Sequence, residues 1–156
     1  MRFSLALTLA SVGLFGLLMA TSPVHAQYDI TQPSKEPAVF KAQLLQFTQL
    51  TKKNIRDIQA LSPDDSSPLD PVVQSCHYAY QLIRAAQWGM NVAVGQQIYK
   101  DPVLVLAQKR AEQAWNLSRY PAQSPGNVSR AEWISHSVQD LSKSLRLAQQ
   151  ALMMIP

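Results

Sequence analysis

The most restrictive feature of the sequence is a set of apolar residues near its C-terminal end that recur every three or four positions. Seven such residues follow one another without a gap: Ile134, Val138, Leu141, Leu145, Ala148, Leu152 and Ile155. A half-buried strand would alternate apolar and polar residues, so this spacing predicts a long amphipathic helix with a coiled-coil-like seam. Ser129 and Glu132 have the spacing of a capping box and predict that this helix begins beside them.

Three earlier segments have a similar periodicity and predict three more helices. Their apolar positions are Phe40, Leu44, Phe47, Ile55, Ile58 and Leu61 in 36–61; Val72, Cys76, Ala79, Ile83, Ala86, Met90 and Ala93 in 70–98; and Leu104, Ala107, Ala111 and Ala114 in 102–120. Asp70 and Asp101 each precede a proline, which predicts an N-cap followed by Pro in the first turn. The second helix has the widest apolar surface, and we expect it to be the most buried of the set.

The connection between the second and third helices is very short, so these helices must form an antiparallel hairpin. Ala85, Gly89 and Ala93 recur at four-residue spacing on the second helix. Such small residues predict close packing of the two helices, which would explain the helix-weakening Gly89 and Gly95. The fold class expected from the four segments is all-α, an antiparallel up-down-up-down four-helix bundle.

The N-terminal segment predicts export. Arg2 provides a positive start, and the apolar run LALTLASVGLFGLLM follows over residues 5–19. Val24 and Ala26 are small or apolar, as a signal peptidase requires at the third and the last position before its cut. The run is shorter than the roughly 20 apolar residues of a bilayer span. We therefore predict a signal peptide over 1–26, cleaved after Ala26, rather than a retained membrane anchor.

The rest of the chain is predicted to contain a flexible polar leader over 27–35 and a single bundle domain over 36–156. The full chain has 14 basic and 10 acidic residues, a net charge of +4 that loses one unit with Arg2. These charges are scattered, whereas nucleic-acid-binding proteins usually concentrate basic residues on one face. We expect no nucleic-acid partner and no stable membrane span after cleavage.

Cys76 is the single cysteine, so the chain cannot form an internal disulfide and its stability must come from helix packing. Cys76 falls on the apolar stripe of the second helix, which predicts that it is buried. A homodimer, through the seam of the fourth helix or a Cys76–Cys76 bridge, is an alternative.

The sequence shows no constellation typical of catalysis. Outside the predicted signal peptide there are two histidines, His77 and His136, and Asp140 follows His136 by one helical turn as a solvated pair would. No glycine-rich phosphate loop or nucleophile elbow is present in the sequence. The motif Cys-x-x-Cys-His, which attaches haem covalently, is also absent.

We expect no catalytic residues, no metal site and no cofactor. The alternative is a carrier bundle that binds haem without covalent attachment, or copper through softer ligands such as Cys76 and Met90.

One flank of the second helix combines aromatic and basic residues, and we interpret it as an interaction surface. His77, Tyr80, Arg84 and Trp88 succeed one another at three- and four-residue steps, with Arg84 placed to stack between the two larger rings. Trp, Tyr and Arg dominate the energetic centres of protein interfaces. Such side chains can also cover the edge of a neighbouring helix. The same two interpretations apply to Trp115 and Trp133, with Tyr120 nearby.

These observations predict a small exported helical protein that is not an enzyme. Its expected role is protein–protein interaction, or that of an accessory module, in the periplasm or outside the cell. The sequence does not identify the protein partner. The runner-up is the haem- or metal-binding carrier described above.

Overall fold

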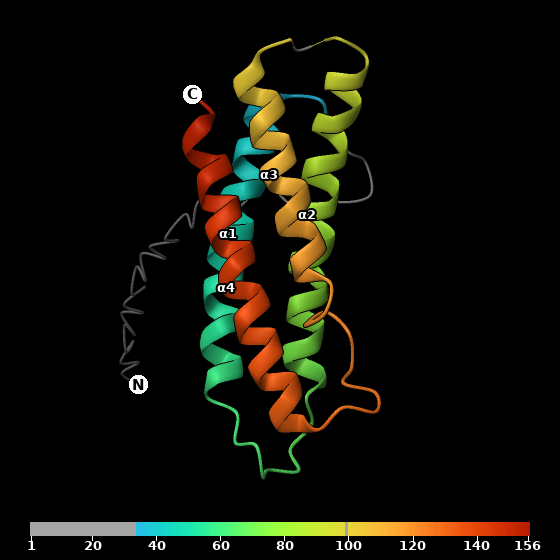
Figure 1. Ribbon diagram of the computed structural model, residues 1–156, viewed down its shortest axis with the longest axis vertical. Coiled ribbons are helices and arrows are strands. Elements are labelled where there is room, and N and C mark those ends of the chain that lie inside the picture. Colours follow the sequence, from blue (N-terminus) through green and yellow to red (C-terminus); the bar gives the residue numbers. More distant parts are fainter. Residues whose placement is uncertain (1–33, 99) are drawn as a thin grey trace, which may run out of the picture.

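The structure, a computed structural model, describes residues 34–98 and 100–156. Within these residues it contains four helices, α1 (Pro37–Gln59), α2 (Asp70–Gly95), α3 (Pro102–Ser118) and α4 (Arg130–Met154). They lie side by side, and successive helices run in opposite directions (Figure 1). Contacts join α1 to α2, α2 to α3, α3 to α4 and α4 back to α1. The predicted all-α up-down-up-down four-helix bundle is therefore confirmed.

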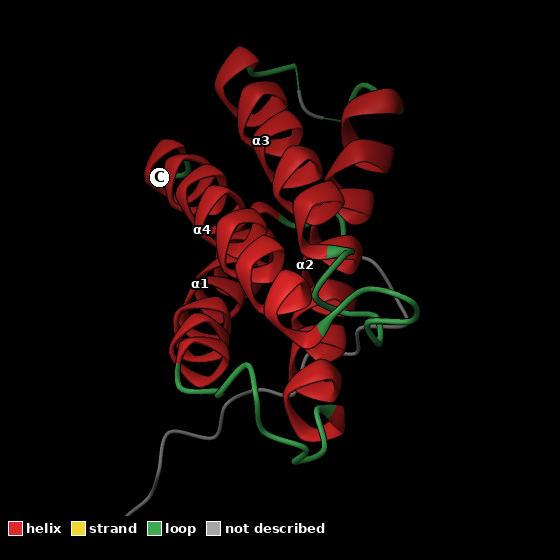
Figure 2. Cartoon of the chain, turned by 60° about the horizontal axis from the view of Figure 1, so that its bottom comes forward, coloured by secondary structure: helices red, strands yellow, loops and turns green. Residues whose placement is uncertain are grey.

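The predicted signal peptide over 1–26, including its cleavage at Ala26, lies outside the described residues, as does most of the leader predicted over 27–35. In the described part of the chain, the elements between the helices are loops and turns, and no strand occurs (Figure 2). No helix among these residues is long and apolar enough to cross a membrane.

The buried residues of each helix repeat with the three-and-four spacing of a coiled-coil seam. On α1 they include Phe40, Leu44, Phe47, Thr51, Asn54 and Ile58. The apolar ones form two clusters: a large one that extends over all four helices, and a smaller one around Ile58, Cys76 and Trp133. α2 has more buried residues than any other helix, as its wide apolar surface predicted.

The buried line of α4 differs from the seam predicted for it. Leu141, Ala148 and Ile155 are buried as expected, but Ile134, Val138, Leu145 and Leu152 are only half-buried. The other buried positions are Trp133, Ser137, Ser144 and Ala151. Small side chains at three of these four positions let the α4 backbone approach its neighbours, and the Ser144 hydroxyl donates a 2.6 Å hydrogen bond to the Ala114 carbonyl of α3. The larger apolar residues therefore lie at the edge of the interface.

Two of the three predicted caps are confirmed. The Asp101 carboxylate accepts a hydrogen bond from the Val103 N–H at 2.9 Å, and the Ser129 hydroxyl accepts one from the Glu132 N–H at 3.1 Å. The cap predicted at Asp70 is wrong, because α2 begins at Asp70 itself and the N-cap is Leu69. Asp70 instead places a negative charge in the first turn, where it is favourable to the helix dipole.

Gly89 is explained by a close backbone contact, but not with the helix that we expected. A β-carbon at this position would overlap the backbone of Ser34, which precedes α1. The next residue, Lys35, donates a hydrogen bond from Nζ to Oε1 of Gln96 at 2.6 Å. The last two residues of the predicted leader therefore pack along the C-terminal part of α2. Gly95 has nothing within 4 Å of such a β-carbon, so packing does not explain it.

At the end of the bundle where α4 begins, Arg130, the first residue of α4, contacts the connection between α1 and α2. Its guanidinium donates from Nε to the Ser62 carbonyl at 2.8 Å and from Nη1 to the Ser67 carbonyl at 2.7 Å. Both acceptors belong to the connection between α1 and α2. Arg130 thereby fixes this connection to the start of α4.

Candidate binding groove between α2 and α3

Three of the predicted surface residues lie along one line of α2, because Tyr80, Arg84 and Trp88 are spaced by about one helical turn. Trp88 is 47% exposed, which is unusual for so large a side chain. The Arg84 guanidinium lies over the Trp88 ring, with its Cζ 5.6 Å from the ring centroid. This geometry is a cation–π contact, which helps to hold the guanidinium beside the ring.

Tyr80 contacts α3 rather than Arg84. Its ring centroid lies 6.0 Å from that of Trp115, and the two rings are tilted by 31°. The predicted stacking of Arg84 between two rings of α2 is thus present on the Trp88 side, while Tyr80 pairs with an aromatic residue of the neighbouring helix.

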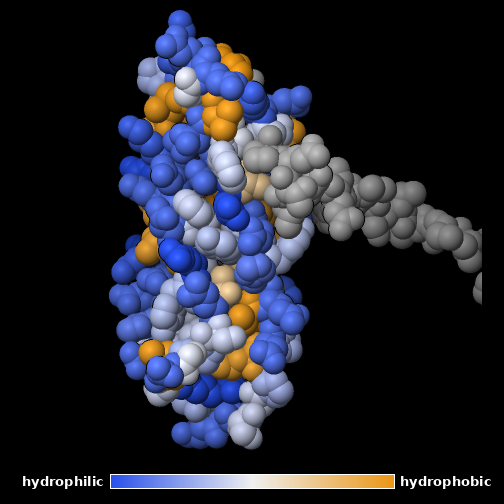
Figure 3. Space-filling view, turned by 90° about the vertical axis from the view of Figure 1, so that its right-hand side faces the viewer, coloured by the Kyte–Doolittle hydropathy of each residue, from blue (hydrophilic) through white to orange (hydrophobic). Residues whose placement is uncertain are grey.

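A groove of about 490 Å³ lies between these two helices. α2 contributes Tyr80, Arg84, Gln87, Trp88 and Asn91, and α3 contributes Glu112 and Trp115 together with its C-cap residue Arg119. This volume is within the roughly 300–1,000 Å³ typical of ligand sites. The side of the bundle formed by α2 is largely hydrophilic, with apolar side chains in separate patches (Figure 3). The groove is therefore a mixed aromatic and polar site, and not part of a continuous apolar face.

His77, the fourth predicted residue, lies beside the groove and does not line it. It is exposed, its ring centroid is 6.2 Å from that of Tyr80, and its Nε2 lies 3.3 Å from Nε2 of Gln81. The α3 wall is not part of the surface predicted from the sequence, although Trp115 is one of the other aromatic candidates there. Glu112, Trp115 and Arg119 have the spacing of one helical face, so the antiparallel hairpin together with this spacing could have identified them.

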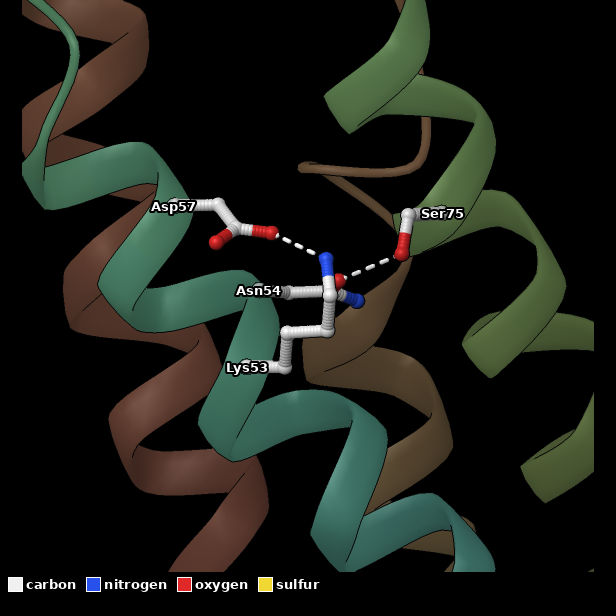
Figure 4. A network of polar contacts seen from close by, with 4 residues as sticks. All are labelled: Lys53, Asn54, Asp57 and Ser75. Atoms are coloured by element: carbon white, nitrogen blue, oxygen red, sulfur yellow. Dashed lines mark hydrogen bonds and ion pairs between the residues drawn. The ribbon is translucent and has the colours of Figure 1, made fainter.

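The charges in the groove are not neutralised by one another. Within the described ranges, the single ion pair joins Lys53 to Asp57 on α1 (Figure 4). Glu112 therefore forms no ion pair with Arg84 or Arg119, although all three line the same groove. Two guanidinium groups and one carboxylate give the groove a net charge of +1, and both cations remain available to a partner.

The other aromatic set of the sequence does not form a comparable surface. Trp133 is fully buried, and its indole N–H donates to the Gln123 carbonyl at 3.1 Å. Tyr120 makes an edge contact with His136, with ring centroids 5.8 Å apart. Trp133 is thus neither an interaction surface nor a cover over the edge of a neighbouring helix, and both of these predictions are wrong for it. Its side chain belongs to the core and holds the connection between α3 and α4.

Several polar side chains lie inside the bundle. The Ser75 hydroxyl of α2 donates a 2.6 Å hydrogen bond to Oδ1 of Asn54 on α1 (Figure 4). The Asn54 amide nitrogen and the hydroxyls of Thr51 and Ser137 are buried without a hydrogen-bond partner among the described residues.

The two described histidines and Cys76 differ in their exposure. No group of three or more His, Cys, Asp or Glu side chains that could hold a metal ion occurs among the residues that the structure describes. His77 and His136 are both exposed, and His136 forms no ion pair with Asp140. Cys76 is 1% exposed, as its position on the apolar stripe predicted, and burial raises the pKa of its thiol to about 12.

The described chain is thus an all-α four-helix bundle with an aromatic and basic groove between two neighbouring helices. Comparisons with protein-family models, with curated proteins and with solved structures each find no match to it.

Proposed function

We propose that this protein is an exported binding module, not an enzyme, and that it holds a protein partner in the groove between α2 and α3. It acts in the periplasm or outside the cell, to which the N-terminal segment would direct it. The observation that carries the proposal is the groove, which brings Tyr80, Trp88 and Trp115 together with two arginines that form no ion pair with any described residue.

The composition of the groove supports a protein partner. Tyr, Trp and Arg are the residue types that contribute most to binding energy at protein interfaces. Tyr80, Trp115 and Arg84 are each held by a neighbouring aromatic ring, so little side-chain entropy remains to be lost on binding. The groove lies on two packed helices, which keep its walls in a fixed position.

The experiment compares two triple variants of the exported protein. Tyr80→Ala, Arg84→Ala and Trp88→Ala together remove the α2 wall of the groove. Leu45→Ala, Tyr78→Ala and Arg146→Ala remove exposed side chains of similar types elsewhere on the bundle. Each variant is used as bait in the envelope fraction or culture fluid of its source, and captured proteins are identified by mass spectrometry.

We expect the groove variant to lose the partner that the unmodified protein and the control variant retain. Circular dichroism should show equal helix content in all three proteins. Equal capture by the groove variant would contradict the proposal. An absorption band of haem, or copper bound at one equivalent in the purified protein, would instead support a carrier function.

A further inference from the structure

We infer that the groove recognises an acidic segment of the partner, with a glutamate or aspartate side chain held between Arg84 and Arg119 and apolar neighbours against the tryptophan rings. This inference rests on the proposed function and specifies the chemistry of the partner. It depends on the arrangement of charge within the groove, which no pattern in the sequence revealed.

The two arginines come from opposite walls of the groove, Arg84 from α2 and Arg119 from the C-cap of α3. Neither forms an ion pair with any residue that the structure describes. A guanidinium presents several N–H donors in one plane and binds a carboxylate better than other side chains do. A carboxylate that enters between the walls would therefore meet donors from both helices.

The aromatic rings determine which carboxylates fit. The Arg84 Cζ lies 5.6 Å from the Trp88 ring centroid, so the cation that would bind the carboxylate stands beside an aromatic ring. Tyr80 and Trp115 form a paired aromatic surface in the same groove. A free acetate or phosphate would use the arginines and leave these rings uncovered. A peptide can place an acidic side chain on the arginines and an apolar neighbour on the rings at once.

Glu112 limits the negative charge that the groove accepts. Its carboxylate lines the same groove as the two arginines, and the resulting net charge of +1 suits one carboxylate. A phosphate, with nearly two negative charges, would meet stronger repulsion from Glu112. A nucleic acid would require a longer row of cations than the two that this groove provides. The charge balance therefore favours a singly acidic protein segment.

The test uses blocked peptides as probes of the full chain labelled with ¹⁵N. The first peptide has one glutamate between two phenylalanines, the second has glutamine in place of the glutamate, and the third probe is inorganic phosphate. Binding is followed by the indole N–H signals of the tryptophans. Trp88 and Trp115 line the groove, whereas Trp133 is fully buried and serves as the internal reference.

We expect the glutamate peptide to shift the signals of Trp88 and Trp115 saturably, and to bind about tenfold more tightly than the glutamine peptide. Replacing both groove arginines, Arg84→Met with Arg119→Met, should abolish this preference. Lys143→Met with Arg146→Met removes the same charge from an exposed part of α4 and should preserve it. Glu112→Gln should tighten binding of the glutamate peptide, because it removes the one negative charge of the groove.

Equal affinity for the two peptides would overturn the inference, as would phosphate that binds at least as tightly as the glutamate peptide. A weaker interaction in the Glu112→Gln variant would also overturn it. If the groove variant loses its captured partner while the peptides show no glutamate preference, the proposed function stands and this inference fails. If the groove variant also captures normally, both fail.

Discussion

The backbone of Ser34 occupies the space that a β-carbon on residue 89 would need. This contact joins the segment before α1 to the C-terminal part of α2, and the hydrogen bond between Lys35 and Gln96 extends it to the C-cap of that helix. The chain therefore begins to pack against the bundle before its first helix starts. Glycine at position 89 weakens the helix by about 1 kcal/mol relative to alanine, but it leaves the space that this contact needs.

The first prediction compares the two glycines of α2. Gly89→Ala should destabilise the fold by about 1–3 kcal/mol, because a backbone segment must move to accept the methyl group. Gly95→Ala should instead stabilise it by about 0.5 kcal/mol, because the added methyl group meets no atom and alanine favours the helix. Urea unfolding of both variants measures these effects. A Gly89→Ala protein as stable as the Gly95→Ala protein would show that the Ser34 contact is not tight.

The second prediction concerns two buried serines of α4 that are seven residues apart. Ser144→Ala should cost about 1 kcal/mol, because it removes the hydrogen bond to the Ala114 carbonyl and leaves that interhelical contact without its donor. Ser137→Ala should be neutral or stabilising, because the Ser137 hydroxyl is buried without a partner in the described chain. Thermal and urea unfolding of the pair provide the comparison, and equal losses of stability would contradict the different roles assigned to the two hydroxyls.

Helix number, order and direction could be predicted from the sequence because each depends on a local signal. Asp101 with Pro102 and Ser129 with Glu132 marked two helix starts correctly, and the short second connection required an antiparallel hairpin. The exact seam of α4 could not be predicted. Apolar periodicity favours the large residues Ile134 and Leu145, whereas the approach of two helices depends on the small residues that lie between them.

The sequence predicted a surface on α2 and not the groove, and three of the predicted residues line it. Periodicity on one helix placed Tyr80, Arg84 and Trp88 together, since only local spacing was needed. The α3 wall depends on which residues two helices bring opposite each other, and a single helix does not contain that information. The pairing of Tyr80 with Trp115 and the absence of an ion pair between Glu112 and the arginines became visible only in three dimensions.

The third prediction concerns Arg130, which holds the connection between α1 and α2. Arg130→Lys should lower stability by about 1–2 kcal/mol, because an ammonium cannot reproduce the separate bonds to the Ser62 and Ser67 carbonyls. Arg146→Lys, at an exposed position of the same helix, should change stability by less than about 0.5 kcal/mol. Hydrogen exchange of residues 62–68 should accelerate in the first variant alone. Unchanged exchange there would show that Arg130 does not hold the loop.

The last prediction concerns the buried thiol of Cys76. The native protein should resist thiol reagents at pH 8 and react fully once unfolded, because the sulfur is covered and burial raises its pKa from 9.0 to about 12. A folded pKa above the unfolded value stabilises the native state below the unfolded pKa, and this contribution falls as pH rises from about 9 to about 12. The stability difference between the wild type and Cys76→Ala should therefore shrink over that alkaline range. Because the Cys76 sulfur is covered in the folded protein, a non-reducing gel of that protein should also show a monomer. A rapidly formed disulfide-linked dimer, or a stability difference constant over this pH range, would mean that Cys76 is more accessible than its place in the core implies.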